Sequence, residues 1–458
     1  MNEESEIVGH PEYVGHTVVH PLGLMAVVVL GICVLLLPRR WAVLPLLIMA
    51  CFIPSAQRIF IIGLNFDFLR IMVLFGVMRL ILRNEHLAFV WKPLDTIMVL
   101  WVCSSMLFYS LQQGTFSAVI NRLGFGFDAF GMYFLFRCLI RNWEDIDRLV
   151  IGCIIISIPV AAFFLLENWT GHNLFSIFGG VDAITPVREG RLRCQGAFSH
   201  AILAGCFWAS LLPLFAAYWW KGIKERVWAV VGLITTSIVV ICCASSTPVM
   251  GVIAGVIGGG MFFLRRHMRL VCWGILLTLI ALHLVMKSPV WYLVGRFSTI
   301  GGSTGWHRVN LINQAILHFN DWWLTGCSGY TVLSWGVHAG DVTNQYILEG
   351  VCGGFLTFCL FIVVIVIAFR EVGSLWRSQS RYPYRLALSW ALGVSLFVHC
   401  INFIGVSYFG QIIMIWYMIL AMIGSLSIQA APMLMPRMIL SSKAIKKQRY
   451  RNLKAGGG

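Results

Sequence analysis

Long apolar runs, broken by short polar connections, fill most of the chain. About 20 consecutive apolar residues are needed for an α-helix to cross the hydrocarbon core of a membrane. The second apolar run is short and contains Pro45, so we expect about 12–13 transmembrane helices. The pattern predicts spans at 22–38, 41–55, 66–82, 94–111, 124–140, 148–167, 199–220, 227–245, 247–264, 269–287, 345–369, 386–406 and 409–428.

These spans predict the fold class and the organisation of the chain. Backbone polar groups in lipid must be satisfied within each segment, so we expect an all-α, polytopic integral membrane protein. The expected parts are an N-terminal tail (1–21), a transmembrane bundle (22–287) with an outer loop at 168–198, a large periplasmic loop (288–344), C-terminal transmembrane helices (345–428) and a basic cytoplasmic tail (429–458). The acidic start has no basic n-region, so we do not expect a cleavable signal peptide.

Composition and charge narrow the class further. Of the 458 residues, 59% are hydrophobic and 12% are charged, whereas soluble domains carry about 25% charged residues. The net charge of +15 lies mainly in short loops and in the tail, so it indicates topology and not nucleic-acid binding. Basic loops follow the odd-numbered spans, which places them in the cytoplasm and places 168–198 and 288–344 outside.

The first outer loop ends in "VREGRLRCQGAFSHAILAG", with Arg188, Arg191 and Arg193 on the side that the positive-inside rule disfavours. One interpretation is that these arginines only snorkel to lipid phosphate. The other is an anion site, in which Gly196 lets the backbone approach a ligand and Ser199 caps the helix that begins at about 200. An arginine fork beside a helix N-terminus suits phosphate.

The second outer loop contains a predicted amphipathic helix at 305–319, with Arg308 near its start. Its apolar positions repeat at helical spacing: Val309, Ile312, Ala315 and Ile316. The loop is also rich in aromatic side chains, namely Trp306, Trp322, Trp323, Tyr330 and Trp335. They form either an interfacial aromatic belt or a set of faces that stack on sugar rings.

A polar collar precedes the next span in "HAGDVTNQYILEGVCGG". An N-cap explains one of its polar residues, but not Asp341, Thr343, Asn344 and Gln345 together with Glu349. Carboxylates within a membrane face a polar interior by default. We therefore expect Glu349 to border a wet cavity mouth shared with the arginine loops.

Other polar residues have a simpler expected role. For Asp67, Arg70, Asp128 and Arg137 we expect structural pairing. The 14 cysteines include no CxxC motif, and most lie inside apolar runs. Cys194 and Cys327 both lie in the outer loops, where a disulfide between them is an open alternative.

Three segments together resemble the family of O-antigen ligases and polysaccharide polymerases. They are "RCQGAFSHAILAGCFWASLLPL", "GWHRVNLINQAILHFNDWWLTGCSGY" and "TNQYILEGVCGGFLTF", and they cover roughly 190–215 and 295–360. The family has an arginine ahead of a Gly-x-Phe-x-His/Asn stretch, an arginine in a large periplasmic loop, and a His-Asn pair before a glycine-rich helix. Here Thr343 replaces that histidine, which departs from the ligases and favours a polymerase.

The resemblance implies a GT-C-like fold in the bacterial inner membrane and a glycosyltransferase that inverts the anomeric centre without a metal or other cofactor. Its partners would be an undecaprenyl-diphosphate-linked oligosaccharide, an acceptor glycan, the lipid bilayer and other polysaccharide export proteins, and not nucleic acid. The candidate catalytic residues are Arg193, Arg308, Asp341 and His338, the last two as alternative bases. The candidate substrate-binding residues are Arg191, His200, Trp306, Asn344, Gln345 and Glu349.

Two other functions fit a polytopic chain. A transporter or lipid-glycan flippase places its substrate site near the midplane, on broken helices within repeated halves. The polar groups here gather at the outer side, which disfavours that alternative. A non-catalytic scaffold within an export system is the third alternative.

Overall fold

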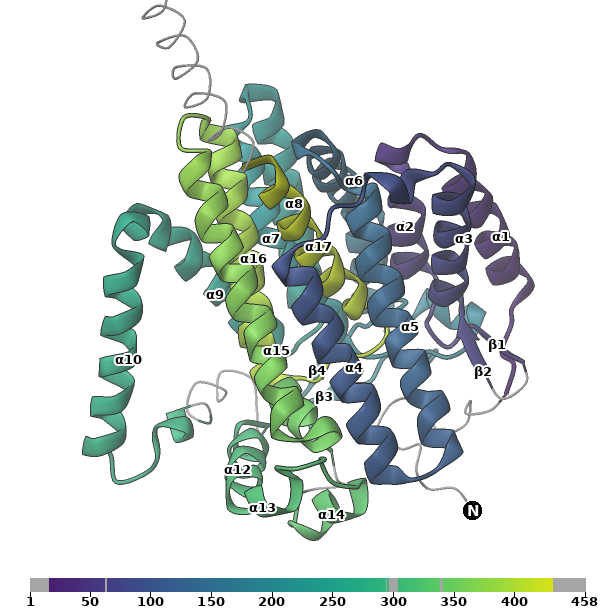
Figure 1. The fold of residues 1–458 in the computed structure, drawn as a ribbon. Helices are drawn as coiled ribbons and strands as arrows, with labels where there is room; N and C mark the ends of the chain where they lie inside the picture. The colour runs from purple at the N-terminus through teal and green to yellow at the C-terminus, as the bar shows by residue number, and fades with distance from the viewer. Residues whose placement is uncertain (1–15, 62–63, 294, 296–303, 338–340, 431–458) are drawn as a thin grey trace, which may run out of the picture.

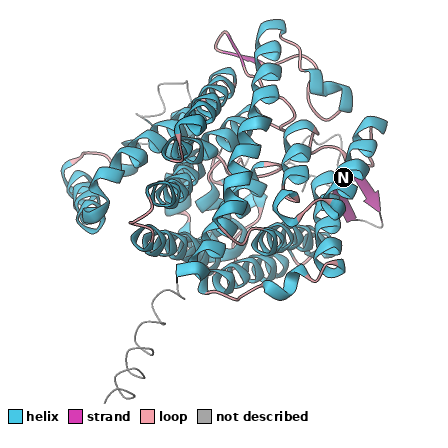
Figure 2. Cartoon of the chain, turned by 90° about the horizontal axis from the view of Figure 1, so that it is seen from above, coloured by secondary structure: helices cyan, strands magenta, loops and turns pink. Residues whose placement is uncertain are grey.

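The computed structural model describes residues 16–61, 64–293, 295, 304–337 and 341–430. The described chain is mainly helical, and its strands form only two small hairpins at the edge of the molecule (Figure 2). The α-helices are α1 (Pro21–Leu36), α2 (Leu44–Phe52), α3 (Phe68–Leu82), α4 (Pro93–Gln113), α5 (Phe116–Leu139), α6 (Trp143–Thr170), α7 (Ala201–Ala217), α8 (Ile223–Cys242), α9 (Ser246–Gly260), α10 (Met268–Val285), α12 (Thr304–Leu317), α13 (Phe319–Trp322), α14 (Gly329–Ser334), α15 (Gln345–Ser378), α16 (Pro383–Gly405) and α17 (Ile412–Ala430). The strands are β1 (Arg58–Ile61), β2 (Leu64–Asp67), β3 (Val187–Arg188) and β4 (Arg191–Leu192).

Every predicted span corresponds to a helix, which confirms the all-α prediction. Within the described residues, seven helical stretches are long and apolar enough to cross a membrane. α9 and α10 count as one of them, Ser246–Val285, because only the short 3₁₀ segment Met261–His267 separates them. α1 and α17 are apolar but shorter. This composition is that of a multi-pass membrane protein, while the finer count of 12–13 spans stays a prediction.

The helices differ in how deeply they are buried. α7 and the first fifteen residues of α17 are buried almost throughout, whereas none of the residues of α10 is buried. In Figure 1, α10 stands apart from the other helices, to which it is joined through 261–267. One continuous core of apolar side chains runs through α1–α8 and α15–α17.

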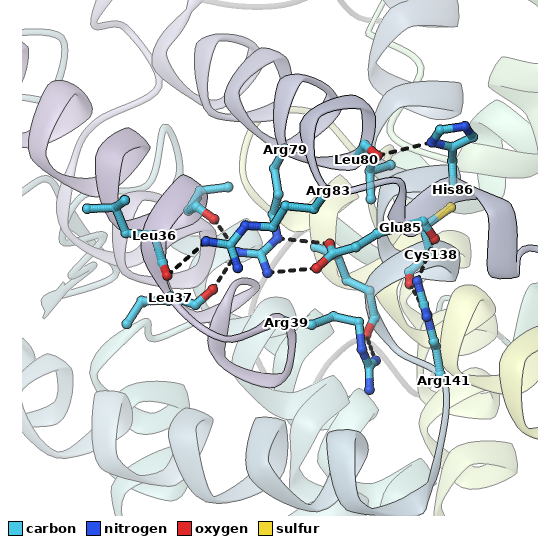
Figure 3. Close-up of polar contacts among 12 residues, drawn as sticks. Leu36, Leu37, Arg39, Arg79, Leu80, Arg83, Glu85, His86, Cys138 and Arg141 are labelled. Carbon is cyan, nitrogen blue, oxygen red and sulfur yellow. Dashed lines mark hydrogen bonds and ion pairs between the residues drawn. The ribbon is translucent and has the colours of Figure 1, made fainter.

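The two ends of the bundle are chemically distinct. We call the end with Arg39, Arg83, Arg141 and Lys221 the basic end, and the end with residues 168–200, 304–337 and 341–344 the long-loop end. At the basic end, the fully buried Arg79 donates to both carboxylate oxygens of Glu85 at 2.9 Å and to the carbonyls of Val34 and Leu37 (Figure 3). It thereby satisfies carbonyls at the C-terminal end of α1 that have no partner within the helix.

The predicted ion pairs hold helices together. Asp67 caps α3 by accepting from the N–H of Arg70, and the Arg70 guanidinium forms a bidentate pair with Asp128 on α5. Arg137 pairs in the same way with Asp95 on α4 at 2.9 Å. These contacts confirm the structural role predicted for them.

The amphipathic helix at 305–319 is also confirmed, as α12 followed by α13. The segment 304–337, called the long loop below, packs against α15 at a kink. At this kink Gly354 has a φ of +73°, and the N–H of Phe355 donates to the carbonyl of Trp323 at 2.8 Å. A Cβ on Gly354 would lie 2.4 Å from the carbonyl oxygen of Leu324. The glycine-rich start of α15 therefore exists because the loop backbone packs directly against it.

All 14 cysteines are free, so Cys194 and Cys327 are not joined by a disulfide. The backbone N–H of Cys194 donates to the carbonyl of Cys242, while that of Cys327 donates to Val351 on α15. Each cysteine is thus held in a different part of the long-loop end.

Candidate functional site

A short hairpin carries the first arginines at the long-loop end. Strands β3 and β4 pair Arg188 with Arg191, and the turn between them uses the left-handed conformations of Glu189 (φ 53°) and Gly190 (φ 74°). Arg193 follows directly, and its N–H donates to the carbonyl of Pro186 at 2.9 Å. The hairpin therefore fixes the backbone that carries these side chains.

Glu167, at the end of α6, holds the segment that follows. Its carboxylate accepts from the backbone N–H groups of Gln195 (3.0 Å) and Gly196 (2.9 Å) and from the hydroxyl of Thr185 (3.2 Å). The side chain is only 2% exposed. Gly196 has a φ of +57°, and a Cβ there would lie 2.5 Å from the ring of Phe164. Glu167 was not among the predicted site residues, although a carboxylate at the long-loop end of an apolar span is a usable signal.

Arg308 enters the site from the other loop. It lies on α12, is 6% exposed, and its Nη2 donates to the Thr247 hydroxyl at 2.7 Å. A Cβ on Gly405 would lie 3.2 Å from the guanidinium carbon. Arg308 is therefore held between the N-terminus of α9, which begins at Ser246, and the C-terminal end of α16. Neither Thr247 nor Gly405 was among the predicted site residues.

The charges of the two loops act on one another. Burial lowers the pKa of Arg193, and the nearby positive charge of Arg188 lowers it further. Burial also lowers the pKa of Arg308, and Arg188 again contributes through repulsion. Burial together with Arg193 and Arg188 lowers the pKa of His200 to about 4. Arg188 is thus an electrostatic neighbour of all three, which indicates one cluster of cationic groups.

This cluster differs from the arginines elsewhere in the bundle. Arg39, Arg70, Arg79 and Arg137 each pair with a carboxylate. Among the described residues, neither Arg188 nor Arg193 has a carboxylate partner, and the buried Nε of Arg193 has no hydrogen-bond partner. Gathering like charges is unfavourable unless an anion offsets the repulsion. The arrangement is therefore typical of an anion-binding site.

The predicted capping residue of α7 is wrong. His200, and not Ser199, is the N-cap: its Nδ1 accepts from the N–H of Ile202 at 3.1 Å. The hydroxyl of Ser199 instead forms a hydrogen bond with that of Ser55 at 2.7 Å. Since Nδ1 is an acceptor, the neutral imidazole of His200 carries its proton on Nε2 and can donate from there.

The predicted wet mouth at Glu349 is also wrong. Glu349 is 4% exposed, and its carboxylate accepts from the indole N–H of Trp101 (2.8 Å) and from Gln345 (2.7 Å). Gln345 also accepts from the N–H of Tyr408, while Asn344 caps α15 and donates to the carbonyl of Ile404. Asn344, Gln345 and Glu349, which were predicted to bind substrate, therefore join helices. The buried hydroxyl of Thr343 has no hydrogen-bond partner among the described residues.

The remaining predicted residues lie at different depths. Asp341 and Arg191 are exposed, and Trp306 is 70% exposed with its ring edge-on to Tyr292. His338 lies outside the described residues. Of the predicted stacking faces, Trp322 and Trp335 are buried in the core of the long loop, whereas Trp323 and Tyr330 are exposed. Only the exposed rings remain available as faces for sugar stacking.

A short segment that sequence analysis treated only as a junction joins these parts. Residues 406–411 connect α16 to α17 at the long-loop end. Tyr408 binds Gln345 through its backbone, and the side chain of Gln411 donates to the carbonyl of Ala197 at 2.7 Å. A Cβ on Gly410 would lie 3.4 Å from the Ser199 hydroxyl. The segment thus fixes the start of α15 relative to the segment that follows Arg193.

Comparison of the chain with protein-family models, with curated proteins and with solved structures gives no match. The chemistry of the site therefore has to be argued from its own geometry.

Proposed function

We propose that the protein is a membrane glycosyltransferase that polymerises or ligates undecaprenyl-diphosphate-linked glycan units at the periplasmic face of the bacterial inner membrane, in exopolysaccharide or O-antigen biosynthesis. The observation that carries the proposal is the cluster of Arg188, Arg193 and Arg308 beside the N-termini of α7 and α9. Guanidinium forks and helix N-termini both favour phosphate oxygens. Two of the three segments that resemble the ligase and polymerase family supply Arg193 and Arg308, while Arg188 lies just before the first of them.

In the proposed reaction, an acceptor hydroxyl attacks the anomeric carbon of the lipid-linked sugar. The new C–O bond forms as the bond between that carbon and the diphosphate oxygen breaks, and the electron pair leaves with the diphosphate. Arg193 and Arg308 would stabilise the charge that develops there. The hydroxyl proton passes to a base, for which Asp341 and His338 remain the candidates, because a Thr343 hydroxyl cannot accept it at neutral pH.

The test uses the purified full-length chain in liposomes, with a lipid-linked oligosaccharide donor and an acceptor glycan supplied on one face. We expect glycan elongation or transfer, and we expect Arg193→Ala and Arg308→Ala each to lower the rate by about 10²–10³-fold, the cost of one preorganised donor. Arg226→Ala, at the basic end, is the matched control and should retain full activity.

Two results would overturn the proposal. Movement of the donor across the bilayer without elongation would indicate a transporter. Unchanged polymer output from a stably folded Arg193→Ala/Arg308→Ala double variant would indicate a scaffold. Loss of chain length on deletion of the protein would identify a polymerase, whereas full-length chains left on the carrier would identify a ligase.

A further inference from the structure

An apolar groove lies beneath α12, next to the arginine cluster. Its volume is about 730 Å³, within the usual size of small-molecule sites. One wall is formed by Ile312, Ala315 and Ile316 of α12. The facing wall includes Ile347 and Phe358 of α15. Its lining is almost wholly apolar, with Asn344 at the start of α15 as an exception.

Arg308 does not line the groove but lies next to one of its lining residues, Ile404, across Gly405. Residues 308, 312 and 315 share a face of α12 because they are spaced at i, i+4 and i+7. Ile404 lines the groove, and the adjacent Gly405 packs against the Arg308 guanidinium. Asn344 donates to the carbonyl of Ile404 at 3.3 Å, so it too lies at this polar end. An apolar groove beside a buried cation suits a molecule with a hydrocarbon chain and an anionic head.

The other end reaches an apolar surface. Phe319 contacts Phe355 edge-on at 5.7 Å, and Phe355 stacks on Phe358 at 5.9 Å. Three side chains here are partly exposed: Phe319 (39%), Phe355 (43%) and Ile316 (51%). The groove is therefore accessible from the flank of α15, the side that a membrane would cover if the bundle is inserted as proposed.

We propose that this groove binds the first isoprenoid units of a polyprenyl diphosphate while its diphosphate is bound at Arg308. The identity of the head group rests on the proposed function. The inference adds that the hydrocarbon chain lies in this groove and that the groove discriminates between carriers of different chain length. Arg308 and Ala315 are seven residues apart, a rise of about 10 Å along the helix, so a chain of two isoprenoid units would end near Ala315. Longer chains would continue towards Phe319.

The test compares carriers of different chain length. Ala315→Trp fills the groove, and Ile316→Trp adds less volume at a half-exposed position where misfolding is a smaller concern. Leu317→Trp is the matched control, because Leu317 is 76% exposed and does not line the groove. With a C55 carrier, we expect the groove variants to raise KM at least about tenfold with little change in kcat. With a C10 carrier, whose chain would end near Ala315, we expect Ile316→Trp to raise KM less than it does with the C55 carrier, and Leu317→Trp to match the wild type.

A second measurement separates this inference from the proposed function. A farnesyl diphosphate analogue with a terminal diazirine should crosslink to peptides from 312–319 and 347–358, and C55 diphosphate should compete with it. This binding is independent of turnover, so it would persist even if the protein were not a transferase. The inference would be overturned if phosphatidylglycerol vesicles abolished the crosslinking. It would also be overturned if the groove variants elongated glycan with the wild-type KM for the C55 carrier.

Discussion

The carboxylate of Glu167 accepts a hydrogen bond from the backbone N–H of Gly196 at 2.9 Å, 29 residues further along the chain. The same carboxylate accepts from Gln195, so the last turn of α6 fixes the backbone that follows Arg193. An anion site needs its donors in place before the ligand arrives. Glu167 therefore acts on the site by positioning, although it does not face the proposed ligand.

We expect Glu167→Gln to weaken both stability and activity. The amide nitrogen of glutamine cannot accept, so at least one buried backbone N–H loses its partner, at a cost of about 1–3 kcal/mol. Thermal unfolding in detergent and the rate of glycan transfer should fall together. Glu144→Gln, at an exposed position in the first turn of the same helix, is the control and should leave both unchanged. Wild-type unfolding and activity in Glu167→Gln would show that the contact does not position the loop.

Thr247 should matter through Arg308. Thr247→Val keeps the shape of the side chain but removes the hydroxyl that accepts from Nη2. A hydrogen bond to a charged group is worth about 1.5–3 kcal/mol, so we expect kcat/KM to fall about 10–100-fold. Thr247→Ser should restore most of the activity, and Thr278→Val on the exposed α10 should have no effect. A loss that serine does not rescue would contradict this role.

The kink in α15 should control the docking of the long loop. Gly354→Ala places a side chain at a φ of +73° and a ψ of −179°, a region that only glycine adopts readily, which costs about 1–3 kcal/mol. It also adds a contact of 2.4 Å with the carbonyl oxygen of Leu324. We expect the segment 304–337 to detach and to be cleaved faster in limited proteolysis. Gly274→Ala on α10, where a Cβ meets nothing within 4 Å, is the control and should be neutral or slightly stabilising. Equal cleavage rates for the two variants would refute the docking argument.

The helices could be predicted because apolar periodicity is a local signal, and all the predicted spans are helical. The roles of the polar residues depend on partners far apart in sequence, which no local pattern gives. Glu349 looked like a cavity residue because its partner Trp101 lies 248 positions away. From the sequence, Thr247 is an ordinary residue in the first turn of a helix. Its role depends on Arg308 of α12, which contacts it only in the folded protein. Arg193 and Arg308 could be singled out because a basic residue at the outer side contradicts the topology that the other charges indicate.

His200 gives the site a pH signature. Its pKa is about 4 in the folded protein, against an ordinary value of 6.5, because it is buried and lies near Arg193 and Arg188. The unfolded chain then binds more protons between these values, so the free energy of unfolding falls as pH decreases from about 6.5 towards 4 and is fully retained above 6.5. His200→Asn keeps a good N-cap but does not titrate.

We therefore expect the melting temperature of the wild type to drop more between pH 7 and pH 4.5 than that of His200→Asn, measured by tryptophan fluorescence. Carboxylates titrate in both proteins, so the difference between the two curves isolates His200. Arg188→Ala, which removes one nearby positive charge, should raise the pKa of His200 and reduce that difference. Superimposable curves for wild type and His200→Asn would mean that His200 is not held neutral by the arginine cluster, and the case for one shared cationic site would weaken accordingly.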